Sequence, residues 1–149
     1  MTLLPPTLEF LRGLWRLNHA LERRSSHMLT HLGITAQQRM VMRCIGCLPG
    51  TSAGQLAEVL HLDPGTLSAT LRRLEDRGLI RRARDRDDSR RIIVSLTARG
   101  KLLDVPTAHT VEAAAERLLA ETPPERVAAL AGDLARFAAL LEESSESSP

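Results

Sequence analysis

Residues 63–79, DPGTLSATLRRLEDRGL, carry the strongest structural signal in the sequence. Asp63 is a residue type that accepts hydrogen bonds at the start of a helix, and proline is favoured at the position after it. Gly78 stands where a left-handed residue commonly ends a helix. Three leucines share one face of the helix that we expect at 64–77: Leu67, Leu71 and Leu74.

Another short helix is expected directly before this one. Ser52 and Gln55 have the three-residue spacing of a capping box, and apolar residues follow them at helical spacing. Only residues 61–63 separate the two helices. Two short helices joined by so tight a turn are the layout of a helix-turn-helix.

Two short runs of strand-forming residues follow the quoted stretch, at 79–84 and 92–96. The residues between them, 85–91, are all polar. We therefore expect a two-stranded hairpin with a charged tip, a wing. So small a sheet needs packing support from the helices.

Helical periodicity also covers both ends of the chain. Thr35 and Gln38 form a second capping-box pattern, and Pro106 is expected to kink or split the helix that starts at Thr97. The polar tail 144–149 is expected to be disordered. The fold class is thus mainly α with a small two-stranded β-wing, a winged helix-turn-helix with added terminal helices. Those further helices are expected at 7–31, 36–48, 111–120 and 123–142.

The charge of the chain is unevenly distributed. Residues 72–91 contain nine arginines and five acidic residues, whereas 104–149 contain nine acidic residues and three arginines. This pattern indicates one surface for a polyanion and another kept away from it, although a solvated charge run gives the same pattern. Nineteen of the 20 basic residues are arginine, which suits phosphate and guanine but equally reflects codon usage in a GC-rich genome.

Several functional classes find no support in the sequence. There is no catalytic motif, phosphate-binding glycine loop or complete metal-ligand set, so we expect neither an enzyme nor a cofactor. No apolar run approaches the ~20 residues of a membrane span, and no basic segment precedes the apolar residues at the start. Two cysteines in such a chain fit a reducing cytoplasm, which is the expected location.

Over 34–103 the chain resembles the MarR family of transcriptional regulators. The resemblance lies in an ordered series of motifs. They are Thr35-x-x-Gln38, Leu56-Ala57, Asp63-Pro64-Gly65-Thr66-Leu67-Ser68, Leu74-Glu75-Asp76-Arg77-Gly78-Leu79-Ile80, Arg84-Asp85-x-x-Asp88-x-Arg90 and Leu96-Thr97-x-x-Gly100. Each motif alone is weak, but their order and spacing together are specific.

The resemblance implies a homodimeric repressor that binds double-stranded DNA and is released by a small-molecule effector. Residues 1–33 and 101–143 would interlace with the partner, and 34–100 would bind DNA. Pro106 departs from the long, continuous helix of the family and leaves the dimer geometry open. A two-fold dimer with paired recognition helices is expected to bind a pseudo-palindromic operator.

The expected DNA contacts come from two elements. The outward face of the 64–77 helix suits the major groove, because small residues at its front allow close approach and arginines follow. By resemblance, Arg90 inserts into the minor groove and Asp88 orients it. The recognition-helix candidates are Pro64, Gly65, Thr66, Ser68, Ala69, Thr70, Arg72 and Arg73, and those of the wing are Arg84, Arg86, Asp88, Arg90 and Arg91.

Cys44 and Cys47 form a Cys-x-x-Cys pair with two interpretations. We favour a structural role, because they lie in the C-terminal half of their helix, where the dipole disfavours thiolate. The alternative is a thiol-based redox sensor, as in some relatives of the family. A dithiol redox enzyme is not expected, since such a pair belongs at a helix start beside a βαβ unit.

Two further groups of residues are candidates for binding sites. His27 and His31 have a spacing that suits metal, but no carboxylate or cysteine lies nearby in sequence, so we expect none bound. Trp15 packs in the core or dimer interface, or lines an effector pocket. If Trp15 lines such a pocket, His19 and Arg43 would supply the polar side of the pocket, which would bind an aromatic acid.

Overall fold

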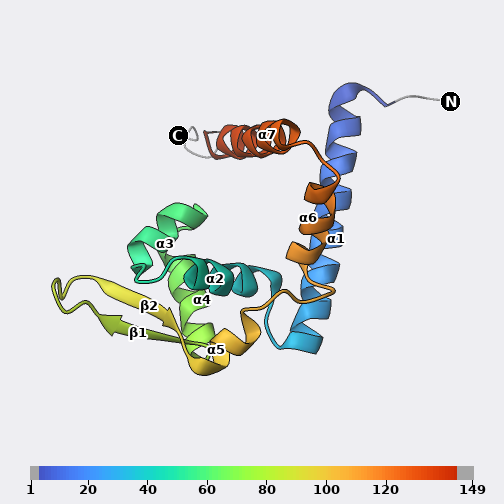
Figure 1. Cartoon of the computed structure of the whole chain (residues 1–149). Helices are drawn as coiled ribbons and strands as arrows, with labels where there is room; N and C mark the ends of the chain where they lie inside the picture. The colour runs from blue at the N-terminus through green and yellow to red at the C-terminus, as the bar shows by residue number, and fades with distance from the viewer. Residues whose placement is uncertain (1–3, 144–149) are drawn as a thin grey trace. The chain divides into compact units, whose positions relative to one another are not determined.

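The computed structural model describes residues 4–143, so the tail predicted at 144–149 lies outside the described residues. The chain forms two compact units that divide after Val111. The first holds α1 (Pro6–Leu32), α2 (Ala36–Cys47), α3 (Ala53–Leu60), α4 (Pro64–Asp76), β1 (Ile80–Arg84), β2 (Ile92–Leu96) and α5 (Ala98–Leu103). Then come α6 (Val111–Ala120) and α7 (Pro124–Glu143). Figure 1 confirms the expected fold class, mainly α with a two-stranded wing.

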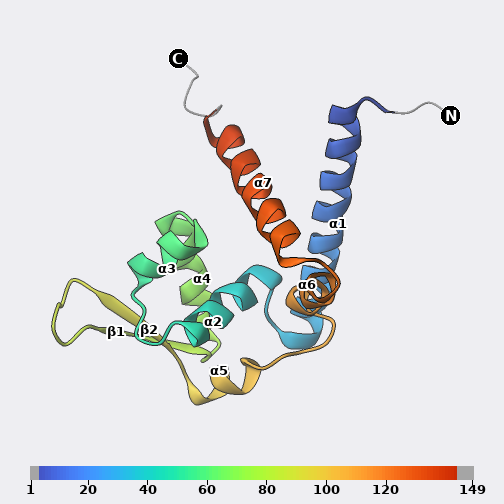
Figure 2. The same ribbon diagram turned by 45° about the horizontal axis from the view of Figure 1, so that its top comes forward.

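The core of the first unit is built around α2, which packs against both α1 and α4 (Figure 2). Its side chains come from the helices, the connecting segments and the two strands, and each is at most 3% exposed. Removal of this apolar surface from water is the main stabilising contribution. The buried set is Ile34, Val41, Met42, Ile45, Leu56, Leu67, Leu71, Leu74, Leu79, Ile80 and Val94.

The wing has the support that so small a sheet needs. Strands β1 and β2 pair antiparallel, from Ile80 opposite Leu96 to Arg84 opposite Ile92. The backbone N–H of Val94 also donates to the carbonyl of Thr51 at 3.0 Å, and Ser52 forms a bridge with Ile93. The segment before α3 thereby joins the sheet to the helices.

The predicted helix ends are confirmed in atomic detail. Thr35 with Gln38, and Ser52 with Gln55, form complete capping boxes. Gly78 has a φ of 69°, a left-handed conformation that favours glycine, and it directly follows Arg77, the C-cap of α4. These caps satisfy backbone groups that helix ends otherwise leave without partners.

Arg39 holds the segment that follows α5. It is 1% exposed, and its guanidinium donates to the carbonyls of Leu103 (2.9 Å) and Val105 (2.8 Å) and to Oγ1 of Thr107 (3.2 Å). Pro106 lies within this segment, between the end of α5 and the start of α6. The predicted split of the helix at Pro106 is therefore confirmed.

The terminal helices expose apolar side chains. On α1, Phe10 and Trp15 are 53% and 64% exposed; on α7, Leu130 and Leu134 are 50% and 45% exposed. The predicted functional segments 1–33, 34–100 and 101–143 stay predictions, because contacts within one chain do not report a partner. No helix in the described part of the chain is long and apolar enough to cross a membrane.

Candidate DNA interface

The front of α4 is organised by its cap. The carboxylate of Asp63 accepts hydrogen bonds from the backbone N–H groups of Gly65 (2.9 Å) and Thr66 (3.2 Å) and from the Thr66 hydroxyl. These bonds hold the pKa of Asp63 below its usual value, and the bond from the Thr66 hydroxyl has the largest effect. The acid therefore stays ionised, and the first turn of α4 has a defined backbone position.

The outward face of α4 carries most of the residues predicted for it, but not Thr70. Thr70 is 5% exposed, and its Oγ1 donates to the carbonyl of Thr66 at 3.0 Å. The prediction that it faces outward is wrong, because it lies three residues after Leu67 and four before Leu74, on the buried stripe. The exposed positions are Pro64, Gly65, Thr66, Ser68, Ala69, Arg72 and Arg73.

An ion pair joins the recognition helix to the wing. Nε of Arg82, on β1, donates to Oε2 of Glu75, on α4, at 2.8 Å. The bond from Arg82 lowers the pKa of Glu75, and it raises the pKa of Arg82 in turn. The pair connects the two candidate DNA-contacting elements. The sequence does not predict this pair, since opposite charges seven positions apart across a turn are a weak signal.

The wing tip is a sequence of tight turns. The backbone N–H of Asp87 donates to Oδ1 of Asp85, and that of Arg90 donates to Oδ1 of Asp88, both at 3.0 Å. Arg91 forms an ion pair with Asp85 at 3.4 Å. Within residues 4–143 the guanidinium groups of Arg86 and Arg90 have no ion-pair partner, so their charge remains available to a polyanion.

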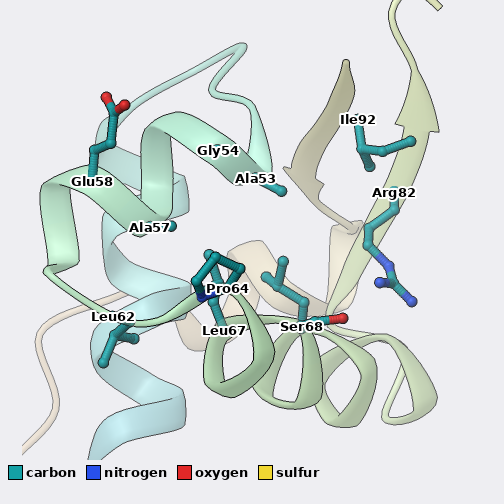
Figure 3. A pocket seen from close by; sticks show the side chains of 11 residues that line it. Ala53, Gly54, Ala57, Glu58, Leu62, Pro64, Leu67, Ser68, Arg82 and Ile92 are labelled. Carbon is teal, nitrogen blue, oxygen red and sulfur yellow. The ribbon is translucent and has the colours of Figure 1, made fainter. Parts of the chain in front are cut away.

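A hollow of about 530 Å³ borders the front of α4 (Figure 3). Pro64 and Ser68 of α4 lie between Ala57 of α3 and the sheet residues Arg82 and Ile92. Its lining is largely apolar. The wing therefore leaves the front of the recognition helix uncovered, and the predicted contact residues there are accessible.

The cysteines are free thiols near the end of α2. Cys44 is half-buried and Cys47 is exposed. Burial, and then the neighbouring Cys47, raise the pKa of the Cys44 thiol. A raised pKa disfavours the reactive thiolate, which is consistent with the structural interpretation.

The structure does not show the residues predicted for an effector pocket in contact with one another. Trp15 and His19 are exposed on α1, whereas Arg43 of α2 forms an ion pair with Asp104 at 3.0 Å. Within the described residues, no hydrogen bond links Arg43 to Trp15 or His19. The pocket therefore stays a prediction.

The rings of His27 and His31 stack on each other, and one nitrogen of His31 is already used in a hydrogen bond. Their rings stack with centroids 4.0 Å apart and planes inclined by 21°. Nδ1 of His31 donates to the carbonyl of His27 at 2.9 Å, because a carbonyl can only accept. Among the residues that the structure describes, no three potential ligands form a metal cluster.

The comparisons with known proteins agree with this arrangement. The family model described as the MarR family matches residues 34–92. The chain is 39% identical over 83 residues to the HTH-type transcriptional regulator TtmR of Methylorubrum extorquens, a match that covers 56% of this chain but only 43% of that protein. It is 32% identical over 114 residues to the HTH-type transcriptional repressor Rv2887 of Mycobacterium tuberculosis, covering 76% of this chain and 82% of that protein.

Solved structures have the same fold. A mutant of Escherichia coli MarR in complex with operator DNA matches with a TM-score of 0.68 and 26% identity, over 92% of this chain and 99% of that one. The helix-turn-helix, the wing beside it and these relatives lead to one conclusion. The chain belongs to the MarR family of winged helix-turn-helix transcriptional regulators.

Proposed function

We propose that the protein is a homodimeric repressor that binds a pseudo-palindromic operator and is released by a small molecule. The observation that carries the proposal is the exposed face of α4 beside a wing with available arginines. Two relatives support the same function: Rv2887 is a transcriptional repressor, and the MarR structure contains operator DNA.

The chemistry of the two elements suits double-stranded DNA. An α-helix fits the major groove, where Thr66 and Ser68 reach bases or phosphates and Ala69 contacts a thymine methyl group. Arg72 and Arg73, one turn further on, reach guanine or phosphate. Arg90 at the wing tip enters the minor groove, where narrow A-tracts strengthen the attraction for arginine.

Selection of bound DNA from a random pool tests this function. We expect an enriched pseudo-palindrome with half-sites about one helical turn, ~34 Å, apart, because two recognition helices related by a two-fold axis read adjacent major grooves. Enrichment of no sequence, or of an asymmetric single site, would contradict the proposal.

Dimer formation accounts for the exposed apolar residues of the terminal helices. Light scattering on the intact chain should give a dimer at micromolar concentration. Leu134→Glu, on α7, should shift it toward monomer, because the charge would be buried in the interface. Val59→Glu is the matched control, since Val59 of α3 is 58% exposed and Leu134 is 45% exposed. A monomeric wild-type protein would contradict the proposal.

The effector is expected to be an aromatic or phenolic acid near Trp15, His19 and Arg43. By linkage, it must bind the DNA-incompetent state more tightly. Trp15 is the only tryptophan in the sequence, so its fluorescence reports on this region alone. Titration with benzoate should quench it saturably and weaken DNA binding; Arg43→Gln should abolish both effects. If the quenching persists unchanged in Arg43→Gln, Arg43 does not belong to the effector pocket.

A second candidate is regulation through the two cysteines. The observation in its favour is that Cys44 and Cys47 are free thiols one helical turn apart, with Cys47 exposed. The raised pKa of Cys44 opposes it. Release of DNA on oxidation, rather than by a small acid, would identify this second function.

A further inference from the structure

The C-terminal half of α1 carries a cluster of basic side chains around a hollow of about 510 Å³. Besides Ala20, its lining consists of Arg23, Arg24, His27 and His109. A smaller hollow beside it shares His27 and His109 and adds His31. Residues from one helix and from the segment before α6 therefore gather around a common basic opening, within the first compact unit.

The backbone holds His109 in this position. His109 has a φ of 62°, a left-handed conformation that is uncommon for any residue except glycine. Thr110 beside it is fully buried, and its Oγ1 donates to the carbonyl of Thr107 at 2.7 Å. Thr107 is in turn held by Arg39. The His109 ring lies 6.2 Å from that of His27, centroid to centroid.

Within the described residues, the acidic side chains of the first unit form no ion pair with this cluster. Glu22 accepts a hydrogen bond from the amide of Asn18 at 3.1 Å, and Asp104 is paired with Arg43. The helix α2, which packs on α1, contains no acidic residue, and neither does the segment 105–111. Within the described part of the chain, no ion pair is formed by Arg23 or Arg24.

We propose that Arg23, Arg24, His27 and His109 form a binding site for a small oxyanion, the phosphate group of a small molecule. Two guanidinium groups match the two charges of a phosphate monoester, and imidazole N–H groups supply further donors. The proposal is independent of the proposed operator-binding function. Its lining does not include Trp15, His19 or Arg43.

Electrostatics support the same site. Desolvation, followed by the charges of His31, Arg24 and His109, lowers the pKa of His27. A bound dianion would oppose these effects and favour the charged imidazole. Binding of an oxyanion whose own charge stays constant should therefore tighten as the pH falls from 7.5 to 5.5, through the range in which histidines gain protons.

The test is a titration of the full chain followed through the histidine Cε1–H resonances. The probes are inorganic phosphate and, because its charge is constant over this pH range, sulfate. Sodium chloride at matched ionic strength is the reference. We expect saturable shifts for His27 and His109, with unchanged His19 and His61, and tighter sulfate binding at pH 5.5 than at 7.5. Shifts that chloride reproduces would overturn the proposal.

Variants distinguish binding at the proposed site from non-specific attraction to the positive charge of the protein. Arg23→Gln and Arg24→Gln should each weaken phosphate binding about tenfold, the scale of one charge-assisted hydrogen bond. Arg16→Gln is the control, because it removes the same charge from the same helix two turns away. His109→Asn should also weaken binding while tolerating the left-handed backbone. Equal loss in Arg16→Gln would leave only non-specific attraction.

A last arm distinguishes the source of the phosphate. Short duplex DNA of random sequence should not shift His27 and His109 or compete with sulfate for them. Competition by DNA would mean that this surface contacts the nucleic-acid backbone, and the small-molecule proposal would be wrong. Acetate, which carries a single charge, tests whether the site prefers a dianion. If acetate binds as tightly as phosphate, the proposed match between two guanidinium groups and a dianion is wrong.

Discussion

The backbone N–H of Arg90 donates a hydrogen bond to Oδ1 of Asp88 at 3.0 Å, so the acid shapes the turn that presents the arginine. Both residues lie in the loop between β1 and β2. Asp88 thus contacts the backbone of Arg90 and not its guanidinium, in a local turn that aspartate commonly forms.

The wing variants should differ in size of effect. Arg90→Ala should weaken operator binding by about 1–3 kcal/mol, because it removes the minor-groove contact. Asp88→Ala should cost less, since the guanidinium remains, and Asp88→Asn should restore most of the affinity because an amide oxygen also accepts this bond. Fluorescence anisotropy on operator DNA measures all three. Wild-type affinity in Arg90→Ala would mean that the wing assignment is wrong.

The arginines of α4 can be sorted by salt dependence. If Arg72 or Arg73 contacts only phosphate, its replacement by alanine should weaken binding to all sequences and reduce the salt slope by about one. If it reads guanine, preference at one base pair in each half-site should relax. Affinity against salt, on operator and random DNA, separates these outcomes. A double variant that binds like wild type would exclude the recognition-helix assignment.

Gly100 should be intolerant of any side chain. A Cβ at this position would lie 2.0 Å from the backbone oxygen of Leu79, where neither atom can move without displacing the sheet. Gly100→Ala should lower the free energy of unfolding by about 1–3 kcal/mol. Gly132→Ala is the control, because its Cβ meets no heavy atom within 4 Å, and it should stabilise α7 by about 0.5–1 kcal/mol. Urea denaturation compares them; equal effects would contradict the close approach.

Arg39 should contribute to stability despite its buried charge. Arg39→Met removes its hydrogen bonds to the carbonyls of Leu103 and Val105, and should cost about 1.5–3 kcal/mol. Arg43→Met, which breaks a partly exposed ion pair, should cost at most about 1 kcal/mol. Thermal unfolding provides the comparison. A neutral Arg39→Met would show that the segment after α5 is held by other contacts.

The cysteines should be dispensable for DNA binding. Replacing both Cys44 and Cys47 with serine should change operator affinity by no more than about 0.5 kcal/mol, and wild-type protein should retain DNA after peroxide treatment. Alkylation should modify exposed Cys47 before Cys44, whose thiol has the raised pKa. A wild-type protein that releases DNA on oxidation, beside a double variant that does not, would establish the redox alternative.

Local sequence determined most of the elements of this protein. The caps at Thr35, Ser52 and Asp63 and the stop at Gly78 act over three or four residues, so their positions follow from the residue types alone. The same logic should have placed Thr70 on the buried stripe. Its hydroxyl suggested DNA, but its position relative to Leu67 and Leu74 decides its direction.

Only the tertiary structure brought distant charges together. Arg82 meets Glu75 across a turn, and Arg39 reaches carbonyl groups more than 60 positions away. The basic cluster of His27 and His109 likewise joins α1 to the segment before α6. Residue type says what such side chains can bind, but their partners depend on how the packed helices place the backbone. Sequence periodicity describes one helix at a time and does not give the distances between residues of different elements.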